Sequence, residues 1–224
     1  MIDSIESVVE KNSDDIAICT TADQAESIIA DGKIAAFVGI ENGVAIANDI
    51  DNLQHFYNRG VRYMTLTHTA SSDWCISSAD SNPAFHGLTD FGRDVVRRMN
   101  ELGMIIDISH ASVSAFEETM KITTAPIIAS HSNVYALCDH DRNLTDDQIK
   151  AIAAGGGVIG VNFFNGYISP DFKALMDSLW RDRPDEMNSL EEYFDTGDKL
   201  RRAAYDHSAD MLARYYLDMI ANLI

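Results

Sequence analysis

The chain has 224 residues, and 17 Lys and Arg residues against 35 Asp and Glu residues give it a formal net charge of −18. This acidic balance, with no cluster of basic residues, argues against a nucleic-acid-binding protein, because phosphate affinity depends on clustered Lys and Arg side chains. Hydrophobic residues make up 46% of the chain and charged residues 23%, which is typical of a globular domain and excludes an intrinsically disordered acidic tail.

No apolar run approaches the roughly 20 residues that a membrane span needs. Residues 1–15 are acidic, where a signal peptide is basic and then apolar. We therefore expect no membrane span in this chain and a cytoplasmic location by default, with export as the alternative if a leader precedes this sequence. The cysteines Cys19, Cys75 and Cys138 form no Cys-x-x-Cys pair, so we expect buried thiols and neither a disulfide framework nor a zinc knuckle.

Short apolar runs alternate with segments of helical periodicity through most of the chain. The first run spans residues 33–40 and predicts a strand, and an amphipathic segment that starts at Asp49 or Asp51 predicts the helix behind it. The second run predicts a strand over residues 61–67. A polar segment follows at residues 70–87, and its length is typical of a binding loop.

Three further apolar runs predict strands, at residues 104–109, 126–130 and 157–163. Helices are predicted between the runs: one from the N-cap Thr89 to Gly103, one over residues 112–121, and one from the N-cap Thr145 to Gly155.

After Pro170 the periodicity is helical, with a break near Pro184 and a further predicted helix from about residue 189 to the C-terminus. The alternation of strands and helices, with nearly continuous apolar strands, predicts an α/β fold in which helices cover a parallel sheet. On this pattern alone, an open doubly wound sheet and a closed barrel are both compatible with the sequence.

Ionisable side chains follow four consecutive predicted strands. Glu41, His68, His110 and His131 each stand one or two residues beyond the last clearly apolar position of their run. Parallel strands lie about 4.8 Å apart and their carboxyl ends meet at one mouth, so we expect these side chains to lie close together. Imidazoles and a carboxylate suit Zn²⁺ with an open coordination position, so the pattern predicts a catalytic metal site.

Two further residues are candidates for supporting roles. Asp107 lies inside the apolar run 104–109, which predicts a buried, hydrogen-bonded partner of the site. Arg142 lies in the loop after the fourth strand, where a guanidinium suits a substrate carboxylate. An ordinary surface ion pair with Asp139 or Asp146 is the alternative for Arg142.

These residues lie in segments that resemble a known family. The segments are GIENG at 39–43, GVRYMTLTH at 60–68, HGLTDFGRDVVRRMNELGMIIDISHAS at 86–112, and PIIASHSNVYALCDHDRNLTDDQIKAIAAGGGVIGVNFF at 126–164. Over about residues 20–165 the chain resembles the membrane (renal) dipeptidase family, the zinc-dependent M19 peptidases. The resemblance implies a (β/α)₈ barrel with a two-zinc site that hydrolyses dipeptides, in some members with a D-residue at the carboxyl side.

The resemblance also implies roles for single residues. Glu41 resembles the carboxylate that bridges the two zinc ions, and His110 and His131 resemble the remaining ligands of one of them. His68 resembles the histidine that stabilises the oxyanion, and Arg142 resembles the residue that binds the terminal carboxylate of the substrate. Glu41 and His68 are thus the implied catalytic residues, and a dipeptide is the implied partner. Members of the family are frequently homodimers, so we also expect self-association.

Two motifs of the family have no counterpart in this sequence. They are the His-x-Asp of the first barrel strand and a G-S-D-F-D-G segment on the seventh, which hold the other zinc ion. We therefore expect one zinc site to keep its ligands, and the five predicted strands to be the second to sixth of an incomplete barrel. The expected organisation is a single domain over residues 1–224, with βα units at 20–165 and a helical extension at 166–224.

Zinc-dependent hydrolysis of dipeptides is the function that these residues favour. The alternative is a non-catalytic module that keeps a zinc-binding or interaction role, which the missing motifs favour. A third hypothesis is a metal-dependent amidohydrolase that acts on non-peptide amides or lactones and has no need of Arg142.

Overall fold

A computed structural model describes residues 2–185 and 187 of the chain. The chain divides into two compact units, Met1–Pro170 and Asp171–Ile224. In the second unit, the described residues include most of helix α7 (Pro170–Asp182), where the sequence predicted helix. The helix predicted from residue 189 lies outside the described residues, and the assignment of one domain to residues 1–224 stays a prediction. Within the described part of the chain, no helix combines the length and the apolar character needed to cross a membrane.

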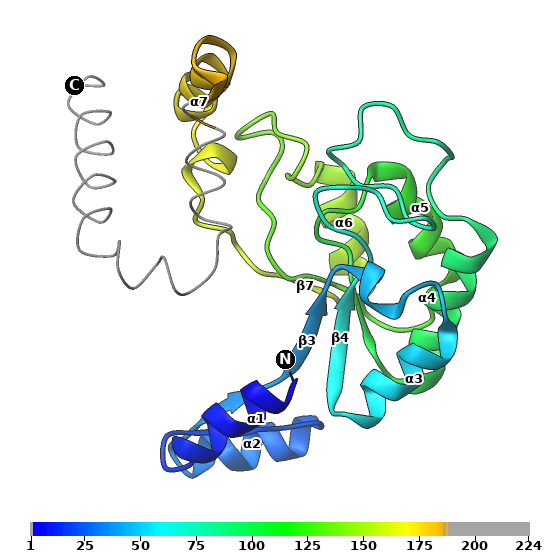
Figure 1. The fold of residues 1–224 in the computed structure, drawn as a ribbon, viewed down its shortest axis with the longest axis vertical. Helices are drawn as coiled ribbons and strands as arrows, with labels where there is room; N and C mark the ends of the chain where they lie inside the picture. Colours follow the sequence, from blue (N-terminus) through cyan, green and yellow to red (C-terminus); the bar gives the residue numbers. More distant parts are fainter. Residues whose placement is uncertain (1, 186, 188–224) are drawn as a thin grey trace. The chain divides into compact units, whose positions relative to one another are not determined.

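The first unit is built on a parallel sheet whose strands lie side by side in chain order (Figure 1). The strands are β3 (Val38–Glu41), β4 (Val61–Thr65), β5 (Ile105–Asp107), β6 (Ile128–Ala129) and β7 (Val158–Ile159). The strand order of a doubly wound sheet reverses at a switch point, whereas an unbroken order is that of consecutive strands in a (β/α)₈ barrel. The predicted α/β fold is confirmed, with five strands arranged as successive strands of a barrel.

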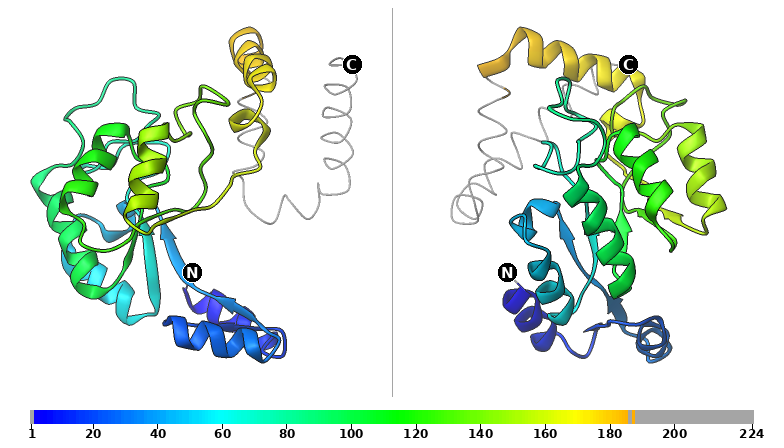
Figure 2. Two further views of the ribbon diagram at one scale, coloured as in Figure 1. Left: turned by 180° about the vertical axis from the view of Figure 1, so that it is seen from behind. Right: turned by 90° about the vertical axis from the view of Figure 1, so that its right-hand side faces the viewer.

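Helices connect these strands and cover one side of the sheet (Figures 1 and 2). They are α3 (Ile50–Asn58), α4 (Asp90–Leu102), α5 (Val113–Ile122) and α6 (Asp146–Ala154), with short 3₁₀ helices at Gly43–Ile46 and Asn165–Tyr167. The N-caps of α3 to α6 each accept a hydrogen bond from a backbone N–H of the first turn; they are Asp49, Thr89, Ser112 and Thr145. The predicted helix starts are confirmed, and of the two candidates Asp49 is the cap of α3.

The core lies between the sheet and these helices. Met64 of β4, Ile106 of β5 and Leu53 of α3 are each no more than 1% exposed. Burial of an aliphatic side chain of this size contributes roughly 1.5–3 kcal/mol. Because successive side chains of a strand point to opposite faces, the residues next to these core positions face the other side. There the register aligns Glu41 with Thr65, and Thr65 with Asp107, at the carboxyl ends of three strands.

The later strands are shorter than the apolar runs predicted. β5 has three residues, and β6 and β7 have two each. The backbone N–H groups of Ser109 and Ser130, beyond the ends of β5 and β6, donate instead to Oδ1 of Asp107, at 3.0 Å and 2.9 Å. A buried carboxylate therefore takes the place of a backbone acceptor where these two strands end.

An N-terminal lobe precedes the main sheet, and the sequence did not predict it. It contains α1 (Ile2–Lys11), β1 (Ile16–Ile18), α2 (Ala22–Ala30) and β2 (Ile34–Ala36), and β1 and β2 form a separate parallel sheet. The prediction of one strand over residues 33–40 is wrong, because β2 ends at Ala36 and β3 begins at Val38 in the other sheet. Only Phe37 separates the two strands, and a continuous apolar run does not reveal where the backbone changes its pairing partner.

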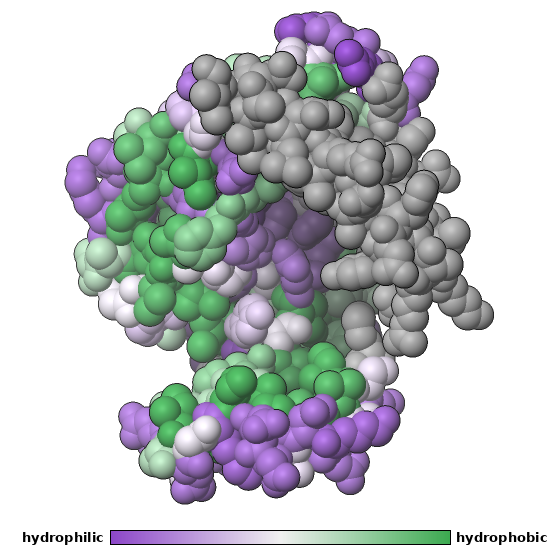
Figure 3. Space-filling view, turned by 90° about the vertical axis from the view of Figure 1, so that its left-hand side faces the viewer, coloured by the Kyte–Doolittle hydropathy of each residue, from purple (hydrophilic) through white to green (hydrophobic). Residues whose placement is uncertain are grey.

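The N-terminal lobe presents hydrophobic residues to one side. Figure 3 shows them along the upper side of the lobe, at the bottom of the view, with hydrophilic residues along its lower side. Ile5, Val8, Ile29 and Ile34 are between 40% and 63% exposed. Helices α1 and α2 contain no buried residue.

Candidate metal centre

Four side chains converge at the carboxyl ends of β3 to β6. Glu41 is the last residue of β3, and His68, His110 and His131 lie in the segments that follow β4, β5 and β6. Oε1 of Glu41 lies 3.6 Å from Nε2 of His68, 3.4 Å from Nε2 of His110 and 3.2 Å from Nε2 of His131. The structure therefore brings together all four residues that follow the predicted strands.

The spacing of these side chains suits a single metal ion. A tetrahedral zinc ion with bonds of about 2.0–2.1 Å separates neighbouring ligand atoms by about 3.3 Å. The ligand atoms of Glu41, His110 and His131 are 2.9 to 3.4 Å apart, which fits this spacing. The ligand atoms of Glu41, His68 and His110 also lie within 4.8 Å of one another. The geometry thus adds His68 to the candidate ligands, although the resemblance gives it a role towards substrate.

His110 is the most deeply buried of the four, with 7% of the residue exposed. Burial, the charge of Arg142 and the neighbouring His68 and His131, in that order, lower the pKa of His110 to about 3. The imidazole is therefore neutral near pH 7, as a metal ligand must be. Its backbone has a φ of 68°, and a residue other than glycine adopts this left-handed conformation at a cost that is typical of functional sites.

Asp107 is fully buried and accepts four hydrogen bonds. Two come from the backbone N–H groups of Ser109 and Ser130, and two from the hydroxyls of Thr65, at 2.6 Å, and Ser130, at 2.5 Å. Oγ of Ser130 also lies 2.7 Å from Nδ1 of His131. Asp107 is thus buried and hydrogen-bonded as the sequence predicted, and Ser130 links it to a candidate ligand.

Arg142 is 7% exposed, and it forms no ion pair with Asp139 or Asp146 in the described part of the chain. Its Nη2 donates to the backbone oxygen of His131 at 3.2 Å, and its guanidinium carbon lies 5.8 Å from the centre of the Tyr167 ring. Its buried Nε has no hydrogen-bond partner among the described residues. The alternative of an ordinary surface ion pair is therefore wrong, because the side chain is buried against the segment that carries His131.

Hydroxyl groups around the histidines were not predicted from the sequence. Ser130 and Thr65 bind Asp107, and Oγ1 of Thr69 lies 3.2 Å from Nδ1 of His68. One signal points to part of this network, because the dipeptide Ser-His ends two consecutive apolar runs, at residues 109–110 and 130–131. In both places, the serine belongs to the hydrogen-bond network around Asp107 and the histidine faces Glu41.

The segment 70–87, predicted as a binding loop, is partly folded into the unit. Cys75 forms an isolated bridge with Leu88, and Ser77 forms one with Ala111. Oγ of Ser77 donates to the backbone oxygen of His68 at 2.6 Å. This part of the segment therefore holds the backbone of His68 in place, while ligand binding by the segment stays a prediction.

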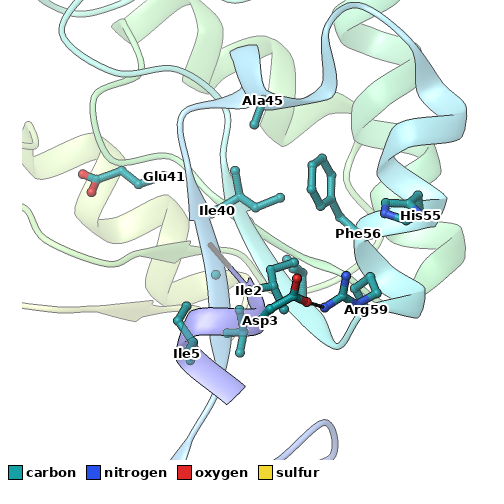
Figure 4. A pocket seen from close by; sticks show the side chains of 12 residues that line it. Ile2, Asp3, Ile5, Ile40, Glu41, Ala45, His55, Phe56 and Arg59 are labelled. Carbon is teal, nitrogen blue, oxygen red and sulfur yellow. Dashed lines mark hydrogen bonds and ion pairs between the residues drawn. The ribbon is translucent and has the colours of Figure 1, made fainter. Parts of the chain in front are cut away.

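A cavity of about 560 Å³ lies beside β3, between α1 and α3 (Figure 4). Ile2, Ile40 and Phe56 contribute apolar side chains to it, and the contact of Asp3 with Arg59 lies at its edge. In Figure 4 the carboxylate of Glu41 points away from these side chains. The carboxylate is therefore directed towards the histidines, although Glu41 is also one of the residues that line this cavity.

A family model described as membrane dipeptidase (peptidase family M19) matches residues 1–210. The chain is also similar to the probable dipeptidase PvdM from Pseudomonas aeruginosa, with 32% identity and a TM-score of 0.73, over 75% of this chain and 44% of that chain.

Two further solved structures are similar to the chain. A metallo peptidase from Rhodobacter sphaeroides, liganded with a phosphinate mimic of the dipeptide L-Ala-D-Ala, has 30% identity and a TM-score of 0.65, over 70% of this chain and 46% of that chain. An amidohydrolase from Pseudomonas aeruginosa has 26% identity and a TM-score of 0.69, over 74% of this chain and 50% of that chain. The chain thus spans about half the length of these solved relatives.

Proposed function

Since the chain belongs to the membrane dipeptidase family, peptidase family M19, we propose that it functions in the zinc-dependent hydrolysis of dipeptides. The observation that carries the proposal is the convergence of a carboxylate and three imidazoles at one end of the sheet. The relative from Rhodobacter sphaeroides was solved with a phosphinate mimic of a dipeptide, which supports a dipeptide substrate for this chain as well.

Glu41, His110 and His131 are the proposed zinc ligands. Glu41 supplies a negative charge, and the two imidazoles supply nitrogen donors at the spacing of neighbouring ligands. A zinc ion held by these residues would supply Lewis-acid chemistry, polarising a carbonyl group and making a water molecule more acidic. The side chain of Glu41 is 52% exposed, so a substrate reaches the group from solvent.

His68 is proposed to act on the substrate. Its side chain is 43% exposed, and its Nε2 lies on the same side of the sheet as the proposed ligands, 3.6 Å from Glu41. Oγ1 of Thr69 lies 3.2 Å from Nδ1 of His68, and when the hydroxyl donates to this nitrogen the proton of the imidazole is on Nε2. From there, His68 donates a hydrogen bond to the oxygen that gains negative charge as the amide is attacked.

Arg142 is proposed to bind the terminal carboxylate of the dipeptide. One of its nitrogens is held by the backbone oxygen of His131, while its Nε has no partner among the described residues. A guanidinium carries five N–H donors and binds carboxylates with two parallel hydrogen bonds. The anchor on His131 places the carboxylate site at a fixed distance from a proposed zinc ligand, and such positioning favours reaction at a defined bond.

We propose one zinc ion per chain from these residues. The sequence has neither the His-x-Asp nor the G-S-D-F-D-G motif that holds the second zinc ion in the family. The second candidate function is a zinc-binding or interaction module without catalytic activity, which needs the same three ligands and no more.

Zinc analysis and a peptidase assay distinguish these candidates. We expect elemental analysis of protein purified without chelator to give about one zinc ion per chain, and His131→Ala to lose it. The control is His55→Ala, at an exposed position on α3. Zinc retention by His131→Ala would contradict the ligand assignment. Bound zinc without hydrolysis of L-Ala-D-Ala would favour the non-catalytic module.

Substitution of Arg142 tests the substrate class. We expect Arg142→Ala to raise KM for a dipeptide with a free carboxylate by one or two orders of magnitude, because a hydrogen-bonded charge pair contributes about 1.5–3 kcal/mol. The blocked dipeptide amide is the matched control substrate. Equal loss on both substrates would assign Arg142 to folding, and no loss on either would favour an amidohydrolase of non-peptide substrates.

A further inference from the structure

The hydroxyl of Ser130 has one proton and three hydrogen-bond partners, of which Oγ of Ser109, at 3.3 Å, is the farthest. Its Oγ lies 2.5 Å from Oδ2 of Asp107 and 2.7 Å from Nδ1 of His131. An ionised carboxylate accepts hydrogen bonds and cannot donate one, so the proton of Ser130 lies towards Asp107. The contact with His131 then needs its own proton, which only Nδ1 of the imidazole can supply.

Asp107 is arranged to be an acceptor on both of its oxygens. Two backbone N–H groups donate to Oδ1, and the hydroxyls of Thr65 and Ser130 donate to Oδ2. Asp107 therefore fixes which way the hydroxyl of Ser130 donates, and Ser130 in turn fixes which partner donates in its contact with His131.

A proton on Nδ1 leaves a lone pair on Nε2 of His131. This nitrogen lies 3.2 Å from Oε1 of Glu41, which is also an acceptor. Two acceptors at this distance repel unless a cation lies between them. The arrangement therefore aims the lone pair of His131 at the place where the proposed zinc ion binds.

The neighbouring His110 completes the pattern. Its Nε2 is 2.9 Å from Nε2 of His131, so in the metal-free protein His110 carries the proton of this hydrogen bond. Its Nδ1 is then an acceptor, and this atom has no hydrogen-bond partner among the described residues. The two imidazoles thus hold their protons on opposite nitrogens.

We propose that Asp107 and Ser130 are positioning residues that hold His131 in its Nδ1–H tautomer and so present the Nε2 lone pair to the metal. The role rests on the proposed function, because it presumes that His131 is a zinc ligand. Partners of this kind, one shell behind the ligands, contribute a factor of about 10 to 100 in metal affinity.

Nitrogen-15 NMR of metal-free protein with labelled histidines tests the tautomers without zinc. We expect His131 to be protonated on Nδ1 and His110 on Nε2, with signals assigned from His131→Gln and His110→Asn. In Ser130→Ala, the proton of His131 is expected to move to Nε2. The control is Ser132→Ala, because Ser132 is 1% exposed, adjoins His131 and has no partner for its Oγ among the described residues. A wild-type His131 protonated on Nε2 would overturn the inference.

Asp107→Asn provides a second variant of nearly the same shape. The amide nitrogen of asparagine donates to Oγ of Ser130, so the serine donates to Nδ1 of His131 and the direction of the chain reverses. We expect His131 to change to its Nε2–H tautomer and zinc affinity to fall. A His131 that keeps its wild-type tautomer in Asp107→Asn would contradict the relay through Ser130.

Zinc titration of the same proteins separates this inference from the proposed function. We expect Ser130→Ala to weaken zinc binding by about 10- to 100-fold, while Ser132→Ala and Ser130→Thr keep the wild-type affinity. Wild-type protein with the expected tautomers but no zinc binding would contradict the proposed function and the role towards the metal, while the hydrogen-bond relay through Ser130 would stand. Equal affinity of wild type and Ser130→Ala would contradict the positioning role alone.

Discussion

The helices of the main sheet and those of the N-terminal lobe differ in what they bury. Each of α3 to α6 places at least one residue in the core, whereas α1 and α2 bury none. Two lobe residues, Ile2 and Ile18, pack partly buried against the core, and α1 is tied to α3 through the contact of Arg59 with Asp3. The candidate metal centre thus lies in the part of the unit that is stabilised by packing, while exposed charges contribute to the attachment of the lobe.

The largest expected difference is in the free energy of unfolding, when one apolar side chain is truncated in the main sheet's helices and one in the N-terminal lobe. Leu53→Ala, at a position with no exposure on α3, is expected to lower the free energy of unfolding by about 2–5 kcal/mol, because it removes buried contacts and leaves a cavity. Val8→Ala, at a 59% exposed position on α1, is expected to change it by less than about 0.5 kcal/mol. Urea denaturation measures both values, and equal losses would show that the lobe shares the core.

We expect the free energy of unfolding to depend on pH through the protonation of His110. The pKa of His110 is lowered by burial from 6.5 to about 3, so between these values the unfolded chain binds a proton that the native chain does not. The free energy of unfolding therefore falls with falling pH in this window, by up to about 1.4 kcal/mol per pH unit. Denaturation of chelator-treated protein at several pH values measures the slope.

His110→Asn is expected to flatten this slope, because asparagine does not titrate and tolerates the left-handed backbone conformation. His55→Asn, at an exposed position, is the control and is expected to keep the wild-type slope. An unchanged slope in His110→Asn would assign the acid sensitivity to another group.

The smallest expected effect concerns the attachment of α1. The hydrogen bond and the charge of Arg59 lower the pKa of Asp3, so the contact is complete above the ordinary value of 3.8 and is lost as the pH falls through the lowered value. Arg59→Gln is expected to speed hydrogen exchange in α1 near pH 7 and to leave α3 to α6 unchanged. Arg97→Gln breaks the exposed pair with Asp94 on α4 and is the control. Faster exchange in both parts would show that the lobe and the main sheet open together.

Features that depend on neighbours in the sequence were predictable. The caps Asp49, Thr89 and Thr145 were found because a short polar side chain before an amphipathic segment bonds the local backbone. The convergence of Glu41 with the histidines was found because parallel strands end at one edge, so equal positions in successive units meet.

Features that depend on long-range partners were not predictable. The apolar run 33–40 does not show that its two halves pair with different strands, and the lobe before it has short strands without a strong pattern. The left-handed backbone of His110 and the contact of Ser130 with Asp107 are set by tertiary packing. Sequence reasoning therefore predicts the residues that meet at the site and the buried Asp107 behind them, but not the hydroxyl groups that link Asp107 to the histidines.

The four hydrogen bonds of Asp107 have a consequence for anyone who transplants this centre into another protein. Thr65 lies at the end of β4, Asp107 at the end of β5 and Ser130 just after β6, so one carboxylate joins the ends of three strands. Between β5 and β6 the register contains a single residue pair, Asp107 with Ile128. A designed scaffold that copies the ligands alone loses the group that spaces the strands, and it needs either the aspartate or longer strands to restore that spacing.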